Sequence, residues 1–412
     1  MSTLAYPGGL YELSPEAKVG DLVNGLVGAL DYSYGNYQVQ ALNQPVVIPE
    51  NLTDPTLPSQ TVSSLNFQAV TFNLANLFDD QDDPQTEDTD LSGPEYQRRL
   101  HKRALAIHSA LGEPVLLAVQ EVENQVVLQD LLAQPEILAN YGYVWQDGPD
   151  RRGLDVALLY RTDQAAVLAS QARQGCTTLV DGLGPDGNLD VENPQNSITC
   201  DSDGDYILDG SRLFSRPPLV VRLNVCPAGC PVLDTPVNLA ADAVVNAAAS
   251  ETIELWIIVN HFKSKTQDTD DIKYTAVRRL EQAEFVRGLV DEILSIQADA
   301  HVLVLGDLND YPDSAPLAEL TVQGLVDLTE SVDKVDRYTY IYEGISYVMD
   351  YALFYPGPGL FPTAVSAAHI NADYPYALWG DESTLHRSSD HDPLLVDFSV
   401  FETFVYLPIM IQ

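Results

Sequence analysis

The stretch His301-Val-Leu-Val-Leu-Gly-Asp-Leu-Asn309 places two polar residues directly after an apolar run. The run His301–Leu305 is typical of a buried strand. Asp307 and Asn309, two residues apart beyond its end, point their side chains the same way, toward the crevice in which open α/β sheets bind ligands. Asp and Asn are also ordinary turn formers, so the stretch alone does not decide between a turn and a site.

Four other strand-like runs end in polar residues in the same way. Five strands that each deliver Asn, Glu, Asp or His at one end predict a metal-assisted hydrolytic site, because such sites combine hard oxygen ligands with an acid–base group. The four runs are Phe67–Asn73, Val115–Glu121, Leu255–His261, and Ser388–His391 before Pro393–Phe398.

These polar residues, taken in chain order, resemble the signature of the endonuclease/exonuclease/phosphatase superfamily. Three local stretches, Thr71–Asp79, Gln120–Asn124 and Asn260–Lys265, are similar to large secreted bacterial nucleases of that group. The resemblance covers about residues 66 to 400. The residues that carry it are Asn73, Glu121, His261, Asp307, Asn309, Asp350, Asp390 and His391.

The resemblance implies a role for each of these polar residues. Asn73, Glu121 and Asp390 would hold Mg²⁺ or Mn²⁺, the kind of cation that oxygen ligands select. Asp307 and Asn309 would hold a second metal position or the oxygen on the nucleophile side. For Glu121 the alternative is a surface acid at a strand end.

His391 is the candidate general base, and Asp350 would orient it. A carboxylate against one ring nitrogen fixes the tautomer and raises the basicity of the imidazole. Asp350 interrupts the strand pattern Ser346–Phe354, where a carboxylate is costly to bury without a partner. A structural salt bridge is the alternative. His261 would contact the scissile phosphate or assist the leaving group, as it does in the relatives.

Four further residues are weaker candidates for contacts to the substrate phosphate. Asp155 lies where related enzymes pair an acid with the first histidine, here His261. Arg216 could clamp a phosphate through two hydrogen bonds, or form a salt bridge instead. Lys263 follows His261 closely, and Asn124 ends the Gln120–Asn124 stretch.

Composition limits how the protein can meet a nucleic acid. Lys and Arg total 21 against 60 Asp and Glu, a formal net charge of -39. A field of that sign repels polyphosphates and excludes binding driven by a basic patch. Divalent cations can reverse the local charge, so metal-dependent cleavage stays compatible with this composition.

The four cysteines, Cys176, Cys200, Cys226 and Cys230, predict two disulfides and an oxidising compartment. Cys226–Cys230 is expected to close a small loop, leaving Cys176 with Cys200. A four-cysteine zinc site is the alternative, although the spacing lacks paired CxxC motifs. No signal peptide or membrane-spanning run is evident. We therefore expect a mature or truncated form of an extracellular or cell-surface protein.

The pattern of strands and helices predicts an α/β fold with two packed mixed sheets and helices outside, and the resemblance implies a four-layer α/β sandwich. Residues 66–402 would form the catalytic domain, with a Cys-bearing insertion at about 174–235. Residues 1–65 resemble the truncated end of an OB-like barrel followed by a linker, and residues 403–412 form an apolar tail. Helices are expected over Glu95–Leu111, with Lys102 and Arg103 among the residues of its polar side, and over Tyr274–Gln297.

Two acidic segments are candidates for structural or co-activating Ca²⁺. Asp201, Asp203, Asp205 and Asp209 partly match the opening of an EF-hand loop, but the Gly and Glu of that motif are misplaced or missing. A plain Asx-turn loop is the alternative. Residues 79–90 hold seven acids, and a solvated loop is the alternative to calcium binding there.

The sequence therefore predicts a secreted metal-dependent phosphodiesterase that hydrolyses DNA, with RNA as a further substrate, and with little sequence preference. The rival enzyme is a phosphomonoesterase or a sphingomyelinase-like lipid phosphodiesterase on the same fold. For the lipid enzyme, the loop Tyr374–Trp379 is a candidate membrane-docking element. The rival outside enzymes is a calcium-binding surface module that has lost activity.

Overall fold

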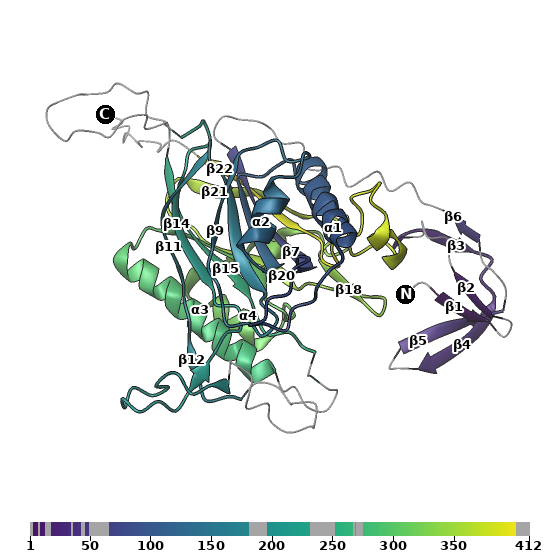
Figure 1. Ribbon diagram of the computed structural model, residues 1–412, viewed down its shortest axis with the longest axis horizontal. Coiled ribbons are helices and arrows are strands. Elements are labelled where there is room, and N and C mark those ends of the chain that lie inside the picture. Colours follow the sequence, from purple (N-terminus) through teal and green to yellow (C-terminus); the bar gives the residue numbers. More distant parts are fainter. Residues whose placement is uncertain are drawn as a thin grey trace, which may run out of the picture.

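A computed structural model of the 412-residue chain describes residues 3–6, 9–12, 18–33, 36–42, 46–48, 66–180, 196–230, 252–266, 268 and 275–400 (Figure 1). The predicted apolar tail at 403–412 lies outside these residues. Within the described ranges, no helix is both long and apolar enough to cross a membrane.

Two six-stranded sheets form the centre of the molecule. In spatial order, the first contains β21 (Leu360–Ala367), β22 (Leu394–Val400), β7 (Asn66–Leu77), β8 (Leu116–Val122), β10 (Asp155–Arg161) and β9 (Tyr141–Trp145). The second contains β11 (Ala165–Ala172), β14 (Leu219–Val225), β15 (Ile253–His261), β16 (His301–Asp307), β20 (Asp350–Tyr355) and β17 (Val326–Asp327).

Helices cover the outer face of each sheet (Figure 1). α1 (Gly93–Leu105), its π-helical continuation η1 (Ala106–Ala110) and α2 (Gln125–Leu132) pack on the first sheet. α3 (Ala276–Ile296) and α4 (Ala315–Leu320) pack on the second sheet. Short 3-10 turns, η3 (Val322–Gly324), η4 (Leu328–Ser331) and η5 (Tyr376–Gly380), lie in the connections. The expected four-layer α/β sandwich is confirmed.

The apolar runs of the sequence arise because central strands are buried on both faces. In β16, Leu303 and Leu305 face the core between the sheets, whereas Val302 and Val304 face α3 and α4. β8 alternates in the same way between the inner core and the core beneath α1 and α2. Such a strand carries few polar residues until it leaves the core, which concentrates polar side chains at its end.

Parallel pairing brings the ends of neighbouring strands to one edge. β7 pairs with β8 in parallel, and β15 pairs with β16 in parallel, while the other pairings of the two sheets are antiparallel. A parallel pair needs a crossover connection, and α1 and α3 supply it. The polar ends of β7, β8, β15 and β16 thereby meet where the two sheets face each other.

The predicted insertion at about 174–235 includes one integral strand, because β14 pairs with both β11 and β15. The rest of its described part holds the ladder of β12 (Cys176–Thr177) and β13 (Ser211–Arg212). Both predicted disulfides are present, Cys176–Cys200 and Cys226–Cys230, so no cysteine is left for a zinc site.

The described parts of residues 1–65 form three two-stranded ladders: β1 (Thr3–Tyr6) with β2 (Gly9–Glu12), β3 (Leu22–Asn24) with β6 (Val46–Ile48), and β4 (Gly28–Ser33) with β5 (Asn36–Ala41). The OB-like assignment of this segment stays a prediction. A backbone hydrogen bond from Val19 to Asp373 joins it to the main domain.

The predicted long helices are confirmed with small shifts in their bounds, but α1 differs in one respect. Lys102 and Arg103 were expected on its polar side, and instead they are 2% and 1% exposed. Both are buried because they donate hydrogen bonds to backbone carbonyl groups of neighbouring loops. Helical periodicity cannot distinguish such a cation from one in solvent.

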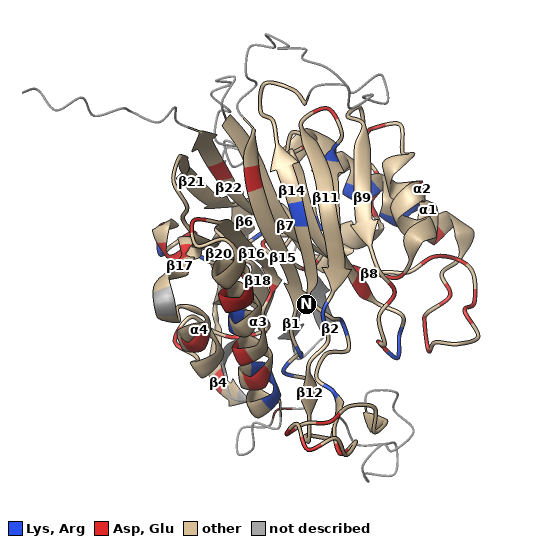
Figure 2. Cartoon of the chain, turned by 90° about the vertical axis from the view of Figure 1, so that its left-hand side faces the viewer, with Lys and Arg blue, Asp and Glu red and all other residues tan. Residues whose placement is uncertain are grey.

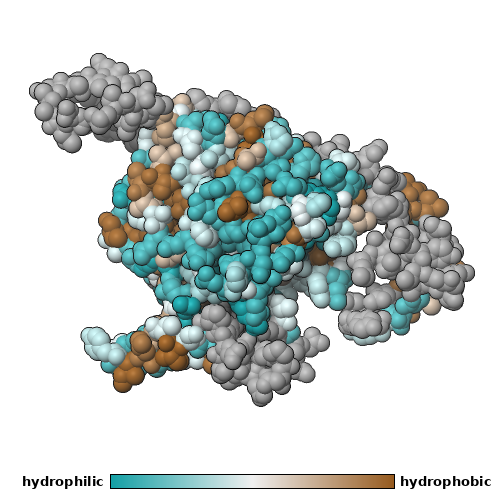
Figure 3. Space-filling model, viewed as in Figure 1, coloured by the Kyte–Doolittle hydropathy of each residue, from teal (hydrophilic) through white to brown (hydrophobic). Residues whose placement is uncertain are grey.

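The surface reflects the acidic composition. Acidic residues are spread over loops and helices on the face shown in Figure 2, where basic ones are fewer. The face shown in Figure 3 is mostly hydrophilic, with hydrophobic residues in separate small groups. Tyr206, Ile207 and Leu208, in the disulfide-linked insertion, are strongly exposed.

Candidate active site

A bulge in β7 positions Asn73. The register with β8 shifts between Asn73 and Leu77, and Ala75 and Asn76 have φ of 53° and 47°. The Asn73 side chain accepts a hydrogen bond from Ala75 N (2.9 Å) and donates one across the sheets to Asp307 Oδ2 (3.1 Å). Asn73 thereby ties the first sheet to the second.

The same bulge orients Glu121, which itself has φ 61°. Asn76 N donates to Glu121 Oε2 (2.6 Å), and Glu121 Oε1 lies 3.7 Å from His261 Nε2. Two arginines of α1 bind the backbone of the bulge. Arg103 donates to the carbonyl groups of Leu74 and Ala75, and Arg99 donates to that of Asn76.

Three residues of the second sheet lie side by side. His261 is in register with Asp307, and Asp307 is in register with Asp350. His261 Nε2 lies 3.6 Å from Asp307 Oδ2. Gly306, with φ 143°, allows this close packing because a Cβ there would lie 2.0 Å from the carbonyl oxygen of Asn260.

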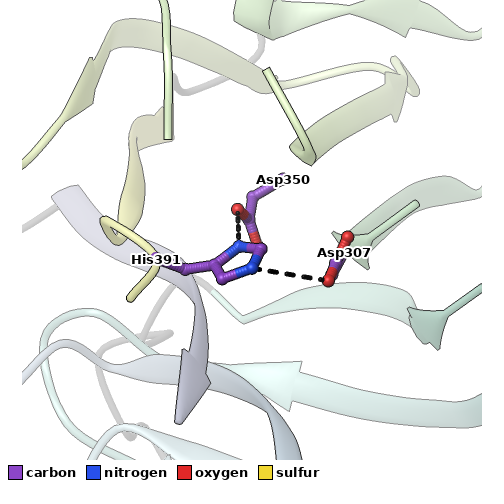
Figure 4. A group of neighbouring side chains, drawn as sticks. All are labelled: Asp307, Asp350 and His391. Atoms are coloured by element: carbon purple, nitrogen blue, oxygen red, sulfur yellow. Dashed lines mark hydrogen bonds and ion pairs between the residues drawn. The ribbon is translucent and has the colours of Figure 1, made fainter. Parts of the chain in front are cut away.

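His391 faces this row from the loop that enters β22. Its Nδ1 lies 2.7 Å from Asp350 Oδ2, and its Nε2 lies 3.9 Å from Asp307 Oδ2 (Figure 4). Ser389 fixes the loop, because its hydroxyl donates to the carbonyl group of Asn73 (2.7 Å) and accepts from His391 N (3.1 Å). The Tyr340 ring packs against the imidazole with 4.7 Å between centroids.

Burial and charge shift the acid–base properties of the cluster. Burial raises the pKa of Asp307 to about 7; the nearby His391 opposes this shift and Asp350 reinforces it. Burial alone would lower the pKa of His391, but the carboxylates of Asp350 and Asp307 raise it well above its ordinary value. Burial lowers the pKa of His261 far below its usual range, and Arg216 and Arg152 lower it further.

The remaining two of the eight polar residues lie beside this cluster. Asn309, with φ 50°, donates its backbone N–H to Asp307 Oδ1 (2.8 Å) and its side-chain amide to the Phe262 carbonyl group (3.2 Å). Asp390 is half-buried and close enough to raise the pKa values of His391 and Tyr340. The structure thus brings all eight residues to one edge of the facing sheets.

The weaker candidates occupy other environments. Asn124 caps the N-terminus of α2, accepting from Val126 N and Val127 N. Arg216 is buried in an ion pair with Asp150 (2.7 Å). Lys263 N donates to the Gln282 side chain. The roles of these three in binding phosphate stay predictions.

The pairing of Asp155 with His261 is not formed. Among the described residues, His261 Nδ1 and Asp155 Oδ2 both lack a hydrogen-bond partner. Burial, followed by the charge of Asp147, raises the pKa of Asp155 well above its usual range.

Sequence reasoning missed Arg152. Its side chain is 47% exposed and donates to the side chain of Asn76 (2.9 Å), the residue whose backbone N binds Glu121. It is also close enough to His261 to lower the pKa of that histidine. Its position next to Arg151 and three residues before Asp155, which was already a candidate for a phosphate contact, was the available signal.

The acidic cluster next to the expected metal ligand Asn73, which bonds to Asp307, fits a divalent cation. Ligand atoms of Asp307, Asp350 and His391 lie within 4.8 Å of one another, and all three residues are buried. Asp350 Oδ1 is buried and has no hydrogen-bond donor among the described residues. Carboxylates converge here without a Lys or Arg partner within the described ranges, an arrangement that a hard cation stabilises.

The sequence profile described as "Endonuclease/Exonuclease/phosphatase family" matches residues 68–184 and 235–352, more than half of the chain. The chain belongs to this family. Members of the endonuclease/exonuclease/phosphatase family are phosphoester hydrolases that generally use divalent metal. No protein with a curated description matches the chain significantly.

Several solved structures are similar to the chain at low sequence identity. An endonuclease/exonuclease/phosphatase from Bacteroides vulgatus is 17% identical, covering 82% of this chain and 99% of that chain with a TM-score of 0.48. A humanized D. rerio TDP2 is 15% identical, with 82% and 100% covered and a TM-score of 0.47. The mannosyl-6-phosphatase Bt3783 from Bacteroides thetaiotaomicron is 14% identical, with 81% and 100% covered and a TM-score of 0.47.

Proposed function

We propose that the protein is a secreted, metal-dependent phosphodiesterase that hydrolyses DNA, and RNA as a further substrate, with little sequence preference. The observation that carries the proposal is the His391–Asp350 pair, whose free Nε2 faces the same buried edge as Asp307, Glu121 and His261. The two disulfides are consistent with an extracellular or cell-surface location.

Asn73, Glu121 and Asp390 would hold the catalytic Mg²⁺ or Mn²⁺, with Asp307 and Asn309 beside it. When bound, the cation neutralises the phosphate oxygens that otherwise repel a nucleophile. The long separations around His261 Nε2, 3.7 Å to Glu121 and 3.6 Å to Asp307, leave this nitrogen free to donate to a substrate phosphate.

His391 would act as the general base. Its Nδ1–H donates to Asp350, which fixes the tautomer and leaves Nε2 to accept a proton from the attacking water. The Tyr340 ring limits the rotation of the imidazole, and the Ser389 hydroxyl fixes the backbone of His391. Such positioning matters because a nucleophile is activated only when the base lies within hydrogen-bond reach.

The test is plasmid cleavage on a gel with magnesium, with calcium, with both, and with EDTA. The wild-type protein is expected to nick the plasmid with magnesium and to be inactive in EDTA. His391→Ala is expected to reduce the rate by roughly a hundredfold or more, as loss of a general base typically does. His108→Ala is the control, because His108 pairs with Glu113 at the surface, away from the site.

An intact plasmid under every metal condition would contradict the nuclease proposal. Hydrolysis of p-nitrophenyl phosphate would then indicate a phosphomonoesterase, and hydrolysis of sphingomyelin a lipid phosphodiesterase. In the aromatic loop expected of the latter, Trp379 packs beneath Arg99 and Arg103, and Tyr376 alone is strongly exposed.

A further inference from the structure

Glu123 presents an unpaired carboxylate oxygen inside the protein. The residue is 5% exposed and lies just beyond β8, two residues after Glu121. Its Oε2 accepts a hydrogen bond from Asp79 N (2.6 Å). Its Oε1 is buried, and no group in the described part of the chain donates to it. Burying a carboxylate oxygen without a hydrogen-bond donor costs free energy unless a proton or a cation neutralises it.

The groups that face Glu123 are also acidic. The carboxyl group of Asp88 lies beside it, and that of Asp79 is close. Ligand oxygens of Asp82, Asp88 and Asp90 lie within 4.8 Å of one another. Arg151, from the connection between β9 and β10, pairs with Glu87 of this loop. Within the described ranges, no lysine or arginine forms an ion pair with Asp82, Asp88, Asp90 or Glu123.

We propose that Asp82, Asp88, Asp90 and Glu123 bind a structural Ca²⁺ ion, separate from the catalytic metal. A single shared proton would relieve only one pair of these four carboxylates, whereas a divalent cation supplies two positive charges to the group. The number of carboxylates favours calcium, because calcium takes six to eight oxygen ligands, whereas magnesium is usually held by one or two carboxylates and keeps several waters.

Calcium at this position would join the loop that follows β7 to the end of β8. Asp79, in the same loop, binds both Glu123 and the side chain of Asn124, the N-cap of α2. The ion would therefore stabilise the loop, the strand end and the helix start as one unit. The ion would stabilise the structure beside Glu121 and take no part in the reaction.

The second acidic cluster offers a matched control. Asp201, Asp203 and Asp205 also bring ligand oxygens together, but these residues are half-buried or exposed. Their oxygens accept backbone N–H groups, for example those of Gly204, Tyr206 and Ile207, much as Asp88 accepts from Asp83 N and the Thr86 hydroxyl. In the described residues no buried, unpaired carboxylate faces this second cluster, so it carries no comparable requirement for a cation.

The experiment is a calcium titration of the metal-free protein by calorimetry, with the thermal midpoint Tm measured with and without calcium. Wild type is expected to gain several degrees in Tm with calcium. Glu123→Gln and Asp88→Asn are expected to lose that gain and to bind calcium at least tenfold more weakly. Asp88→Asn lies in a surface loop, so it remains informative if Glu123→Gln does not fold. Glu121→Gln, at the catalytic site, and the double control Asp203→Asn/Asp205→Asn are expected to keep the gain.

Two results would overturn the proposal. The first is that Asp88→Asn or Glu123→Gln binds calcium as tightly as wild type. The second is that the calcium effect is lost in a control variant, Asp203→Asn/Asp205→Asn or Glu121→Gln, and kept in Asp88→Asn and Glu123→Gln. Absence of any calcium effect on wild type would do the same, and would indicate that Glu123 is neutralised by a proton. None of these results depends on the nuclease activity.

Discussion

Two residues of the candidate site, Glu121 and Asn309, have left-handed backbone conformations with φ of 61° and 50°. Residues with a Cβ rarely adopt this region, and such conformations persist where surrounding bonds enforce them. Asn76 N holds the Glu121 side chain, and Asp307 and Phe262 hold Asn309. These bonds fix the orientation of both side chains, which a regular strand end would not do.

Asp350→Asn is expected to change the pH dependence of catalysis. Asp350 raises the pKa of His391, so removing its charge lowers that pKa. The base must be neutral, and the acidic limb of the kcat/KM profile should therefore move to lower pH. The maximal rate should also fall, because the amide can donate to Nδ1 and favour the wrong tautomer. A profile whose acidic limb stays in place would show that another group limits the rate.

Arg152→Ala is expected to weaken substrate binding. The Arg152 guanidinium is half exposed and bonded to Asn76 beside the cluster, where a phosphate oxygen could reach it. We expect kcat/KM on DNA to fall roughly tenfold, equivalent to about 1.4 kcal/mol, mostly through KM. Arg152→Lys should recover part of the loss, since it keeps the charge. An unchanged KM in the alanine variant would rule out this contact.

At the scale of single elements, α1 does more than cover the first sheet. Arg99 and Arg103 bind the carbonyl groups of the β7 bulge, and Lys102 binds the loop that leads toward His391. The Lys102 ammonium donates to the carbonyl groups of Leu378, Asp381, Thr384 and His386 at 2.7–3.0 Å. One face of α1 therefore positions both the β7 bulge and the loop that leads to His391.

Lys102→Met is expected to destabilise the protein by about 3 kcal/mol, because carbonyl groups left buried without a donor cost about 1–3 kcal/mol each and some will regain water. Methionine keeps most of the side-chain volume, which isolates the effect of the ammonium. Urea denaturation measures the loss, and limited proteolysis should show faster cleavage within residues 376–387.

Lys334→Met is the control for that comparison, because Lys334 is exposed. It should change the free energy of unfolding by less than about 0.5 kcal/mol. Equal stability of the Lys102→Met and Lys334→Met variants would show that the loop does not depend on the ammonium.

At the scale of the whole molecule, the net charge of -39 opposes the approach of a polyanion. Most nucleic-acid-binding proteins lose affinity as salt rises, because they release counterions from phosphates. A protein with the opposite charge balance gains from screening instead, since the Debye length falls from about 30 Å at 0.01 M to about 8 Å at 0.15 M salt.

We therefore expect kcat/KM on DNA to rise as sodium chloride is increased over this range at constant, saturating magnesium. The small diester bis(p-nitrophenyl) phosphate carries one charge and should respond much less, which separates substrate repulsion from effects on the enzyme. Extra divalent cation beyond saturation should also raise the rate on DNA. A steep fall with salt would instead indicate that cations such as Arg152 dominate the local field.

Local patterns in the sequence predicted much of the fold. The apolar runs that became β8 and β16 are legible because both faces of these strands are buried. The length and apolar stripe of α3 predicted its bounds to within two residues at each end. The small number and spacing of the cysteines predicted both disulfides.

Features that depend on distant contacts could not be predicted in the same way. Asn73 bonds to Asp307 across 234 positions of sequence, and no local pattern records that pairing. The bulge at Ala75 and Asn76 contains no glycine to mark its positive φ. Arg103 and Glu123 look like surface residues because a charged side chain in a periodic pattern normally faces water, and only the surrounding carbonyl groups and acids reveal otherwise.

β22 is the last described strand of the chain, yet it lies within its sheet between β21 and β7. During synthesis on a ribosome, that gap in the sheet stays open until every other described strand has emerged. His391, which enters the site just before β22, arrives equally late. The order of translation therefore leaves the candidate site unassembled until the last described strand has been made.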